Sequence, residues 1–275
     1  MRVMTVSLAM MVAGWCPSAA SGAAPGAPQQ MLCEGLVNPS GIDRAQPRFS
    51  WAIPPGARGL TQTAYQLLVA DSPAALAAER ELLWDSGKVA SNQSQWVSYA
   101  GAPLAKGASC WWKVRVWDQT GTASPWSDPA SLSVGPLSAA DWQGDWIGAD
   151  WMTNNEGPLP WLRKTVTLQQ APTTALIYVC ALGYYELYVN GRKVGDDVLS
   201  PAVSDYGRRG LYLTHDITPY LVEGENCIGL WLGRGWSLGV LKNAGNVGPM
   251  VKAELNVTFD KGAPLTIVTD ATWKA

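Results

Sequence analysis

The side chains that could do chemistry concentrate in one stretch of the chain, between Asn190 and Trp236. Its only neighbouring pair of carboxylates is Asp196 and Asp197. Inverting hydrolysis by two carboxyl groups needs them about 6.5–9.5 Å apart, one as acid and one as base. Neighbouring residues on a strand or loop usually point apart, so we expect this pair to form a solvated turn or a cation site rather than a catalytic pair.

The single histidine, His215, is the other candidate for catalysis. A Ser–His–Asp triad needs an aspartate behind the imidazole, but Asp216 is adjacent in sequence and faces away if both residues lie on one strand. We therefore expect His215 to be structural, and we assign no catalytic residue to this chain.

Paired strands must position these side chains. Residues 184–190 alternate between two faces, with Tyr185, Leu187 and Val189 on one of them. Asn190 and Gly191 then predict a tight hairpin turn, because both tolerate positive φ. The polar residues that follow are therefore expected on loops at the end of a β-structure. Further strands are predicted over 161–168, 174–182, 210–217, 227–233, 250–259 and 264–273, the last two forming a hairpin around 260–262.

The preceding part of the chain also reads as short strands, over 64–70, 94–99, 110–118 and 130–135. A short helix is predicted from Pro73 to Arg80, capped by Ser72. About a hundred residues with this spacing favour a fibronectin- or immunoglobulin-like sandwich over 32–135. The fold class predicted for the whole chain is all-β, with two sandwiches joined by a linker over 136–160.

The strand over 110–118 has two distinct faces. Trp112, Val114 and Val116 are expected in the core. The other face alternates indoles with cations, and these side chains are Trp111, Lys113, Arg115 and Trp117, with Trp126 from the next strand. This face could be a sugar platform or a cation–π ladder that stiffens the sandwich. We favour the ladder, because the cations would cover the indole faces that a sugar needs.

Composition agrees with many short strands and excludes several functions. The chain has 28 Gly, 19 Pro and only 15% charged residues, and its net charge of -2 gives no basic surface for nucleic acid. It holds 15 Trp against 2 Phe. Sugar-binding proteins use Trp because its flat indole face stacks on the C–H face of a pyranose. We nevertheless expect most of these indoles to pack in cores or between domains. Trp142, Trp146 and Trp151 in the linker are expected to wedge between the two sandwiches.

The first residues predict export. Arg2 is followed by an apolar run to Cys16 and then small residues, which is typical of a signal peptide over 1–23. A flexible leader is expected over 24–31, and the location is secreted or periplasmic, without a membrane anchor after cleavage. Four cysteines remain, namely Cys33, Cys110, Cys180 and Cys227. Their spacing matches no disulfide framework or metal site, so we expect most to be buried free thiols.

The chain also resembles a known family. The blocks YYELYVNGRKVGD, LSPAVSDYGRRGLYLTHDIT and GENCIGLWLGRGW look like the lectin-like, jelly-roll β-sandwich near the N-terminus of bacterial α-L-rhamnosidases of glycoside hydrolase family 78. Upstream, NPSGIDRAQPRFSW, WWKVRVWDQTGTASPWSDPA and DWQGDWIG occur in the order seen ahead of that domain. The resemblance covers almost all of the chain after the signal peptide.

The resemblance implies a function for the whole protein. The family removes terminal rhamnose from glycosides or polysaccharides by inversion, without a redox cofactor, and its catalytic acids lie in an (α/α)6 barrel that follows this region. The chain would then scaffold that barrel in cis and would be inactive alone, with its second sandwich, over 161–275, incomplete. A free-standing carbohydrate-binding or adhesion module is the alternative. A different glycosidase with a similar front end is a third possibility.

Some sandwich domains of the family are similar to calcium-assisted rhamnose-binding modules, which implies site residues here. Asp196 and Asp197 are the candidate calcium ligands. The candidate sugar-binding residues are Asn190, Asp205, Tyr206, Arg208 and Trp236. Tyr206 and Trp236 would stack on the sugar, and Arg208 would bond its hydroxyls. Ordinary surface roles are the alternative for each of these residues.

Overall fold

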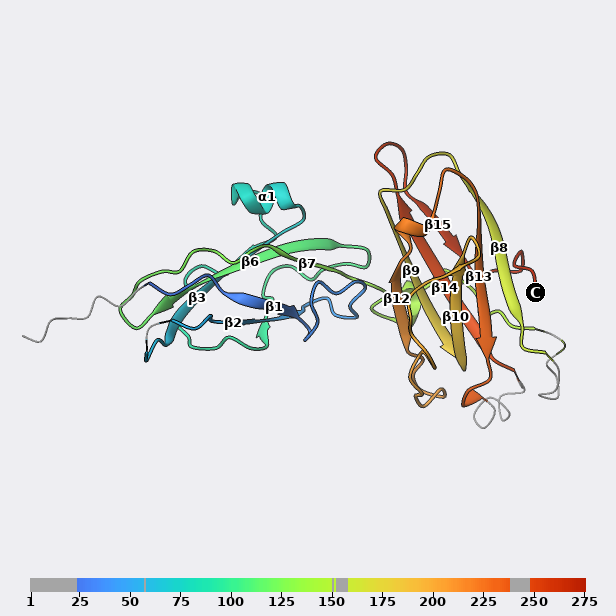
Figure 1. Ribbon diagram of the computed structural model, residues 1–275, viewed down its shortest axis with the longest axis horizontal. Coiled ribbons are helices and arrows are strands. Elements are labelled where there is room, and N and C mark those ends of the chain that lie inside the picture. Colours follow the sequence, from blue (N-terminus) through green and yellow to red (C-terminus); the bar gives the residue numbers. More distant parts are fainter. Residues whose placement is uncertain (1–23, 57, 150, 152–157, 238–247) are drawn as a thin grey trace, which may run out of the picture.

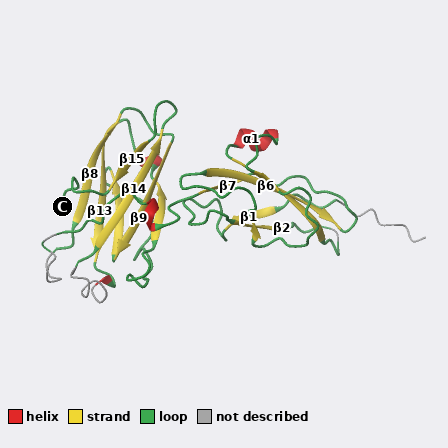
Figure 2. Ribbon diagram, turned by 180° about the vertical axis from the view of Figure 1, so that it is seen from behind, coloured by secondary structure: helices red, strands yellow, loops and turns green. Residues whose placement is uncertain are grey.

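The computed structural model describes residues 24–56, 58–149, 151, 158–237 and 248–275. They form two β-sandwich domains that lie one after the other along the long axis of the molecule (Figure 1). Viewed from behind, strands make up nearly all of the regular structure (Figure 2). The all-β prediction is confirmed. The predicted signal peptide lies outside the described residues.

The first domain pairs a three-stranded sheet, β1-β2-β5, with a four-stranded sheet, β4-β3-β6-β7. Their bounds are β1 (Gln29–Cys33), β2 (Arg48–Ala52), β3 (Gln62–Ala70), β4 (Trp84–Asp85), β5 (Val97–Ser98), β6 (Ser109–Asp118) and β7 (Ala130–Ser133). Helix α1 (Pro73–Ala78) begins at Ser72, whose Oγ accepts a hydrogen bond from the Ala75 amide at 3.2 Å. The predicted cap is thus confirmed.

The start of this domain differs from the prediction. Residues 29–31 belong to β1 rather than to a flexible leader, and β1 pairs with β2, which we did not predict. Neither strand carries a strong local signal, because each is only five residues long and β1 begins with two glutamines. They form because Phe49 and Trp51 enter the core, where both are at most 3% exposed.

The cation–π ladder on β6 is confirmed. Arg115 lies over the rings of Trp126 and Trp117, at 4.5 and 5.0 Å from their centroids. Lys113 covers Trp126 at 4.8 Å. On the opposite face of the strand, Trp112 is fully buried, with Val114 and Val116 beside it. On this surface, cations therefore lie over Trp117 and Trp126, whereas Trp111 packs against the apolar cluster that contains Leu76.

The second domain pairs sheet β11-β10-β13-β8 with sheet β12-β9-β14-β15. Their bounds are β8 (Trp161–Leu168), β9 (Thr174–Leu182), β10 (Tyr184–Val189), β11 (Arg192–Lys193), β12 (Tyr212–Asp216), β13 (Gly224–Gly233), β14 (Met250–Thr258) and β15 (Leu265–Val268). The predicted hairpin is confirmed, since Asn190 and Gly191 have φ of 52° and 78° between β10 and β11. Leu187, Ile228 and Leu230 fill the core from one sheet and Ile177 and Val179 from the other.

The four cysteines after the leader are free thiols. Cys33, Cys110 and Cys180 are buried, and Cys227 is half-buried. Burial raises the pKa of Cys33 to about 12 and that of Cys110 and Cys180 to about 11. Over the described residues, no helix is long and apolar enough to cross a membrane.

Candidate functional site

The predicted site residues fall into two groups at opposite ends of β10. Asn190 lies just after the C-terminal end of β10. Its side chain donates to the Tyr220 carbonyl and to Asn226 Oδ1, both at 2.9 Å, and accepts from the Cys227 amide at 2.8 Å. Tyr206 lies at the N-terminal end of β10, where its hydroxyl accepts a hydrogen bond from the Gly183 amide at 3.3 Å. Six strand residues separate these ends by about 20 Å. The structure therefore does not bring Asn190 together with Tyr206.

Asp205, Arg208 and Trp236 lie at the same end of the second sandwich as Tyr206. Asp205 accepts from the Gly207 amide at 3.2 Å and lies 3.5 Å from the Arg208 guanidinium. Burial raises the pKa of Tyr206, so its phenol is neutral. Trp236 is 65% exposed. This end of the domain, called here the loop end, thus offers two aromatic side chains and the exposed cations Arg208 and Arg209.

Asp196 and Asp197 follow β11 on an exposed turn, as predicted. In the part of the chain that the structure describes, no three acidic, histidine or cysteine side chains group as a metal site would require. Calcium binding by this pair stays a prediction. Calcium takes six to eight oxygen ligands, so neighbouring carbonyls and water would have to complete the coordination of this carboxylate pair.

His215 is positioned by a buried contact. Its Nε2 lies 2.7 Å from the Tyr185 hydroxyl, and the two rings meet edge to face. Asp216 turns away, as predicted, and accepts from the Thr218 amide at 3.0 Å. Among the described residues, no hydrogen bond or ion pair joins His215 to a carboxylate, and a structural role for His215 stays a prediction.

Burial lowers the pKa of His215 below its usual value of 6.5, with an opposing effect from the charge of Asp197. As the pH falls below about 6.5, the unfolded chain takes up a proton at this residue before the folded chain does. The free energy of unfolding should therefore fall between pH 7 and pH 5. His215→Gln, which keeps a partner for Tyr185, should flatten this dependence in urea unfolding curves. If the free energy of unfolding of the variant depends on pH as steeply as that of the parent chain, this role of His215 is wrong.

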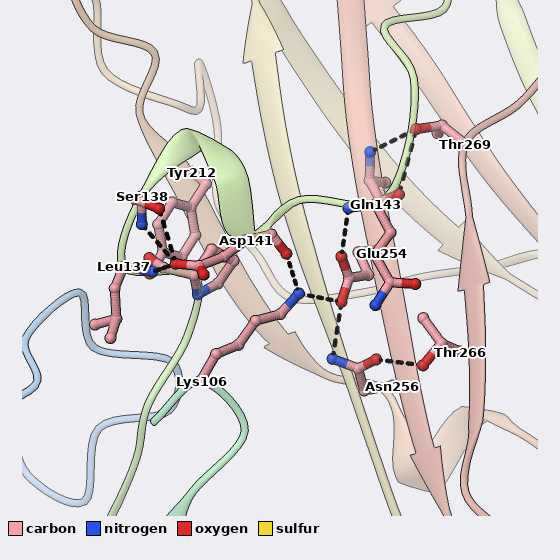
Figure 3. Close-up of polar contacts among 12 residues, drawn as sticks. Lys106, Leu137, Ser138, Asp141, Gln143, Tyr212, Glu254, Asn256, Thr266 and Thr269 are labelled. Atoms are coloured by element: carbon pink, nitrogen blue, oxygen red, sulfur yellow. Dashed lines mark hydrogen bonds and ion pairs between the residues drawn. The ribbon is translucent and has the colours of Figure 1, made fainter. Parts of the chain in front are cut away.

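The junction between the domains is built on a buried ion pair. Lys106, on the loop before β6, reaches across to Glu254 on β14, with 2.6 Å between Nζ and Oε1 (Figure 3). Glu254 is 1% exposed. Its carboxylate also accepts from the Gln143 amide and from Asn256 Nδ2, both at 3.2 Å. Lys106 donates in addition to the Asp141 carbonyl. The charge of Glu254 is thus neutralised by a residue of the other domain.

A second contact brings Tyr212 of β12 against the first domain. Its hydroxyl lies 3.0 Å from the Gly41 carbonyl and 3.1 Å from the Pro136 carbonyl. Trp142 packs edge-on against the Tyr212 ring at 5.6 Å, which confirms its predicted place between the domains. Trp151 differs, because it is 45% exposed and has no ring contact with any other described residue. Its indole N–H instead donates to the Pro158 carbonyl at 3.4 Å.

Beside this contact, an open cleft of about 870 Å³ lies between the two domains. Trp142, Trp146 and Lys252 line it, together with Arg208 and Arg209 of the loop end. Arg209 also forms a 3.7 Å ion pair with Asp43 of the first domain. The loop end and the junction are therefore continuous.

One surface was missed by the sequence analysis. Trp161 of β8 and Trp231 of β13 lie directly opposite each other on the outer face of their sheet, with stacked rings 4.8 Å apart. Tyr188 of β10 meets Trp161 at 5.1 Å. The alternation along 184–190 identified the outward position of Tyr188. The pairing of β8 with β13, which brings the indoles together, depends on tertiary structure and has no local signal.

Comparisons with known proteins agree with this architecture. The model of the Rha78A-like N-terminal immunoglobulin domain matches residues 28–138, and that of the alpha-L-rhamnosidase N-terminal domain matches residues 170–275. An alpha-L-rhamnosidase of Formosa agariphila is 36% identical over 259 residues, which cover 89% of this chain and 28% of that protein. One of Streptomyces avermitilis is 32% identical over 88% of this chain and 24% of that protein.

Solved structures give the same result. The alpha-L-rhamnosidase from Dictyoglumus thermophilum superposes with a TM-score of 0.82 at 31% identity, over 90% of this chain and 29% of that one. This chain spans only 24% to 29% of the length of the curated relatives that it matches.

Proposed function

Since this chain belongs to the α-L-rhamnosidase family and corresponds to its N-terminal region, we propose that it is the non-catalytic front part of a secreted enzyme that hydrolyses terminal α-L-rhamnose. Inverting hydrolysis would be done by two carboxyl groups of a catalytic barrel in cis. This chain would hold that barrel in a defined orientation and would bind sugar at its loop end. Export is supported by the apolar segment before residue 24.

The observation that carries the proposal is the junction. A scaffold must fix the relative positions of the parts it joins, and interdomain contacts within a chain are mobile unless they are specific. Here a carboxylate that is 1% exposed takes its counter-ion from the neighbouring domain. Separating the domains would leave that charge buried and unpaired, which is strongly unfavourable. The two sandwiches are therefore suited to act as one rigid support.

Two assays test the proposal with an aryl α-L-rhamnoside as substrate. The purified chain alone should release no aryl alcohol. A chimera in which this chain replaces the corresponding region of the Formosa agariphila relative should hydrolyse the substrate. Hydrolysis by the chain alone would overturn the non-catalytic role. A folded but inactive chimera would overturn the scaffold role.

A calcium requirement and the loop-end contacts are tested separately, by thermal unfolding and by titration with L-rhamnose. Calcium should raise the melting temperature of the chain only if Asp196 and Asp197 bind it, so Asp196→Asn with Asp197→Asn is the matched variant. Trp236→Ala should weaken rhamnose binding if the loop end contacts the sugar. Equal binding by the variant would remove Trp236 from the site.

A further inference from the structure

The outer face of sheet β11-β10-β13-β8 carries a cluster of aromatic side chains in contact with solvent. Trp161 and Trp231 are 46% and 38% exposed. They take no part in the core, because the opposite face of the same strands, with Leu162 and Leu230, already closes the sandwich. This cluster of Trp161, Trp231 and Tyr188 is called here the aromatic face. A solvated sheet face normally carries polar side chains, so these three need a separate explanation.

The neighbouring positions on the central strand have no side chain. Gly229 and Gly233 flank Trp231 on β13 at the two adjacent outward positions, paired with Tyr188 and Tyr184 of β10. A Cβ added at Gly229 would meet nothing nearer than the Tyr188 Cβ, at 3.8 Å. Gly229 is itself buried and Gly233 is half-buried, so of these two positions only Gly233 leaves backbone within reach of a ligand.

A charged pair borders the aromatic face and orients Tyr188. Glu186, opposite Trp231, accepts from the Tyr188 hydroxyl at 2.8 Å and pairs with Lys193 at 2.6 Å. The hydrogen bond from Lys193 holds the pKa of Glu186 below its usual range, so this group is a carboxylate at neutral pH. Arg163, which is exposed, lies on the other side of Gly229. Both kinds of hydrogen-bonding group, acceptor and donor, thus surround the rings.

The contrast with β6 indicates what this surface can bind. There, Lys113 and Arg115 lie over the ring of Trp126, and Lys88 and Arg115 lie over the ring of Trp117. Among the described residues, no cation lies over Trp161 or Trp231. A purely apolar partner would remove water from Arg163 and from the Glu186–Lys193 ion pair, which is unfavourable. A pyranose matches both features, since its C–H face is apolar and its hydroxyls donate and accept.

We propose that the aromatic face is a second carbohydrate-binding surface, separate from the loop end, that takes a neutral pyranose. A ring would rest its C–H face against the exposed edges of the two stacked indoles, with its hydroxyls toward Glu186, opposite Trp231, and toward Arg163, opposite Gly229. The choice of α-L-rhamnose as that pyranose rests on the proposed function, whereas the pyranose class rests on the geometry alone. The full enzyme would use this surface to retain a polymeric substrate.

The test is a titration of the chain followed by the indole N–H signals in nitrogen–proton correlation spectra. L-Rhamnose, D-galactose, D-glucose and D-xylose serve as the neutral pyranoses. At least one should shift the Trp161 and Trp231 signals, with a dissociation constant of about 1 mM, as expected for one sugar on an open surface. Trp161→Ala and Trp231→Ala should each weaken binding at least about tenfold. Trp96→Ala is the matched control, because Trp96 is 47% exposed in the first domain, and it should bind normally.

Each outcome has one meaning. If none of the four sugars shifts these signals at about fifty times that concentration, the proposal is wrong, and a contact with another protein domain is then the better explanation. Shifts with another pyranose but not with rhamnose keep the surface and remove rhamnose as its ligand. Hydrolysis of an aryl rhamnoside by the chimera tests the proposed function, whereas the Trp161 and Trp231 signals of the chain alone test this surface, so a failure of one is distinguishable from a failure of the other.

Discussion

Replacement of Lys106 by alanine is expected to lower the free energy of unfolding of the chain by about 3 kcal/mol, because it leaves a buried carboxylate without its counter-ion. Glu254 is 1% exposed and takes its positive charge only from Lys106 among the ion pairs of the described residues. The amides of Gln143 and Asn256 remain as donors, but they do not neutralise the charge. Denaturant unfolding followed by tryptophan fluorescence measures the change.

Lys164→Ala is the matched control. Lys164 also forms a short ion pair, 2.9 Å to Asp270, but that carboxylate is 34% exposed and stays hydrated when its partner is lost. The expected loss is about 1 kcal/mol or less. The double variant Lys106→Met with Glu254→Gln should recover much of the stability lost by Lys106→Ala, because no buried charge remains. Equal losses for the Lys106 and Lys164 variants would show that the buried pair has no special role.

Replacement of Gly41 by alanine should separate the two domains without unfolding either of them. A Cβ at this position would lie 2.1 Å from Thr214 Oγ1 on β12, and Gly41 has a φ of +69°. The left-handed conformation alone costs an alanine about 1–2 kcal/mol. The clash adds to this, and β12 can relieve it only by moving away. The radius of gyration in solution scattering should rise, and proteolysis in the linker should accelerate, while far-ultraviolet circular dichroism is preserved.

Gly121→Ala is the control that measures the cost of the left-handed backbone conformation without a clash. Gly121 has a φ of +81° in a turn of the same domain, and an added Cβ would meet nothing within 4 Å. This variant should lose stability but keep the radius of gyration of the parent chain. If Gly41→Ala behaves like Gly121→Ala in scattering, the contact between Gly41 and Thr214 does not hold the domains together.

Sequence patterns were sufficient for most strands, because the alternation of buried and exposed residues is strong where one sheet face is solvated. The strand over 110–118 and the hairpin at Asn190 are examples, each with its own local signal. Strands β1 and β2 were missed, since their stability comes from the core packing of Phe49 and Trp51 rather than from local propensity.

The candidate sites were harder to predict than the fold. Sequence proximity suggested that Asn190 and the residues after it form one site, but β10 separates its two ends, and Asn190 is fully engaged in hydrogen bonds. The aromatic face combines Trp161 and Trp231, which are seventy positions apart in the sequence. Contacts of that separation follow from strand order, which a single sequence does not specify.

The unequal burial of the cysteines makes the chain suitable for selective chemical labelling. Cys33, Cys110 and Cys180 are buried thiols whose raised pKa values keep them protonated and slow to react at neutral pH. Cys227 is half-buried on β13, two outward positions from Trp231 on the same side of the strand. A maleimide fluorophore or spin label should therefore attach there first, and it would sit beside the aromatic face as a native probe of whatever approaches that surface.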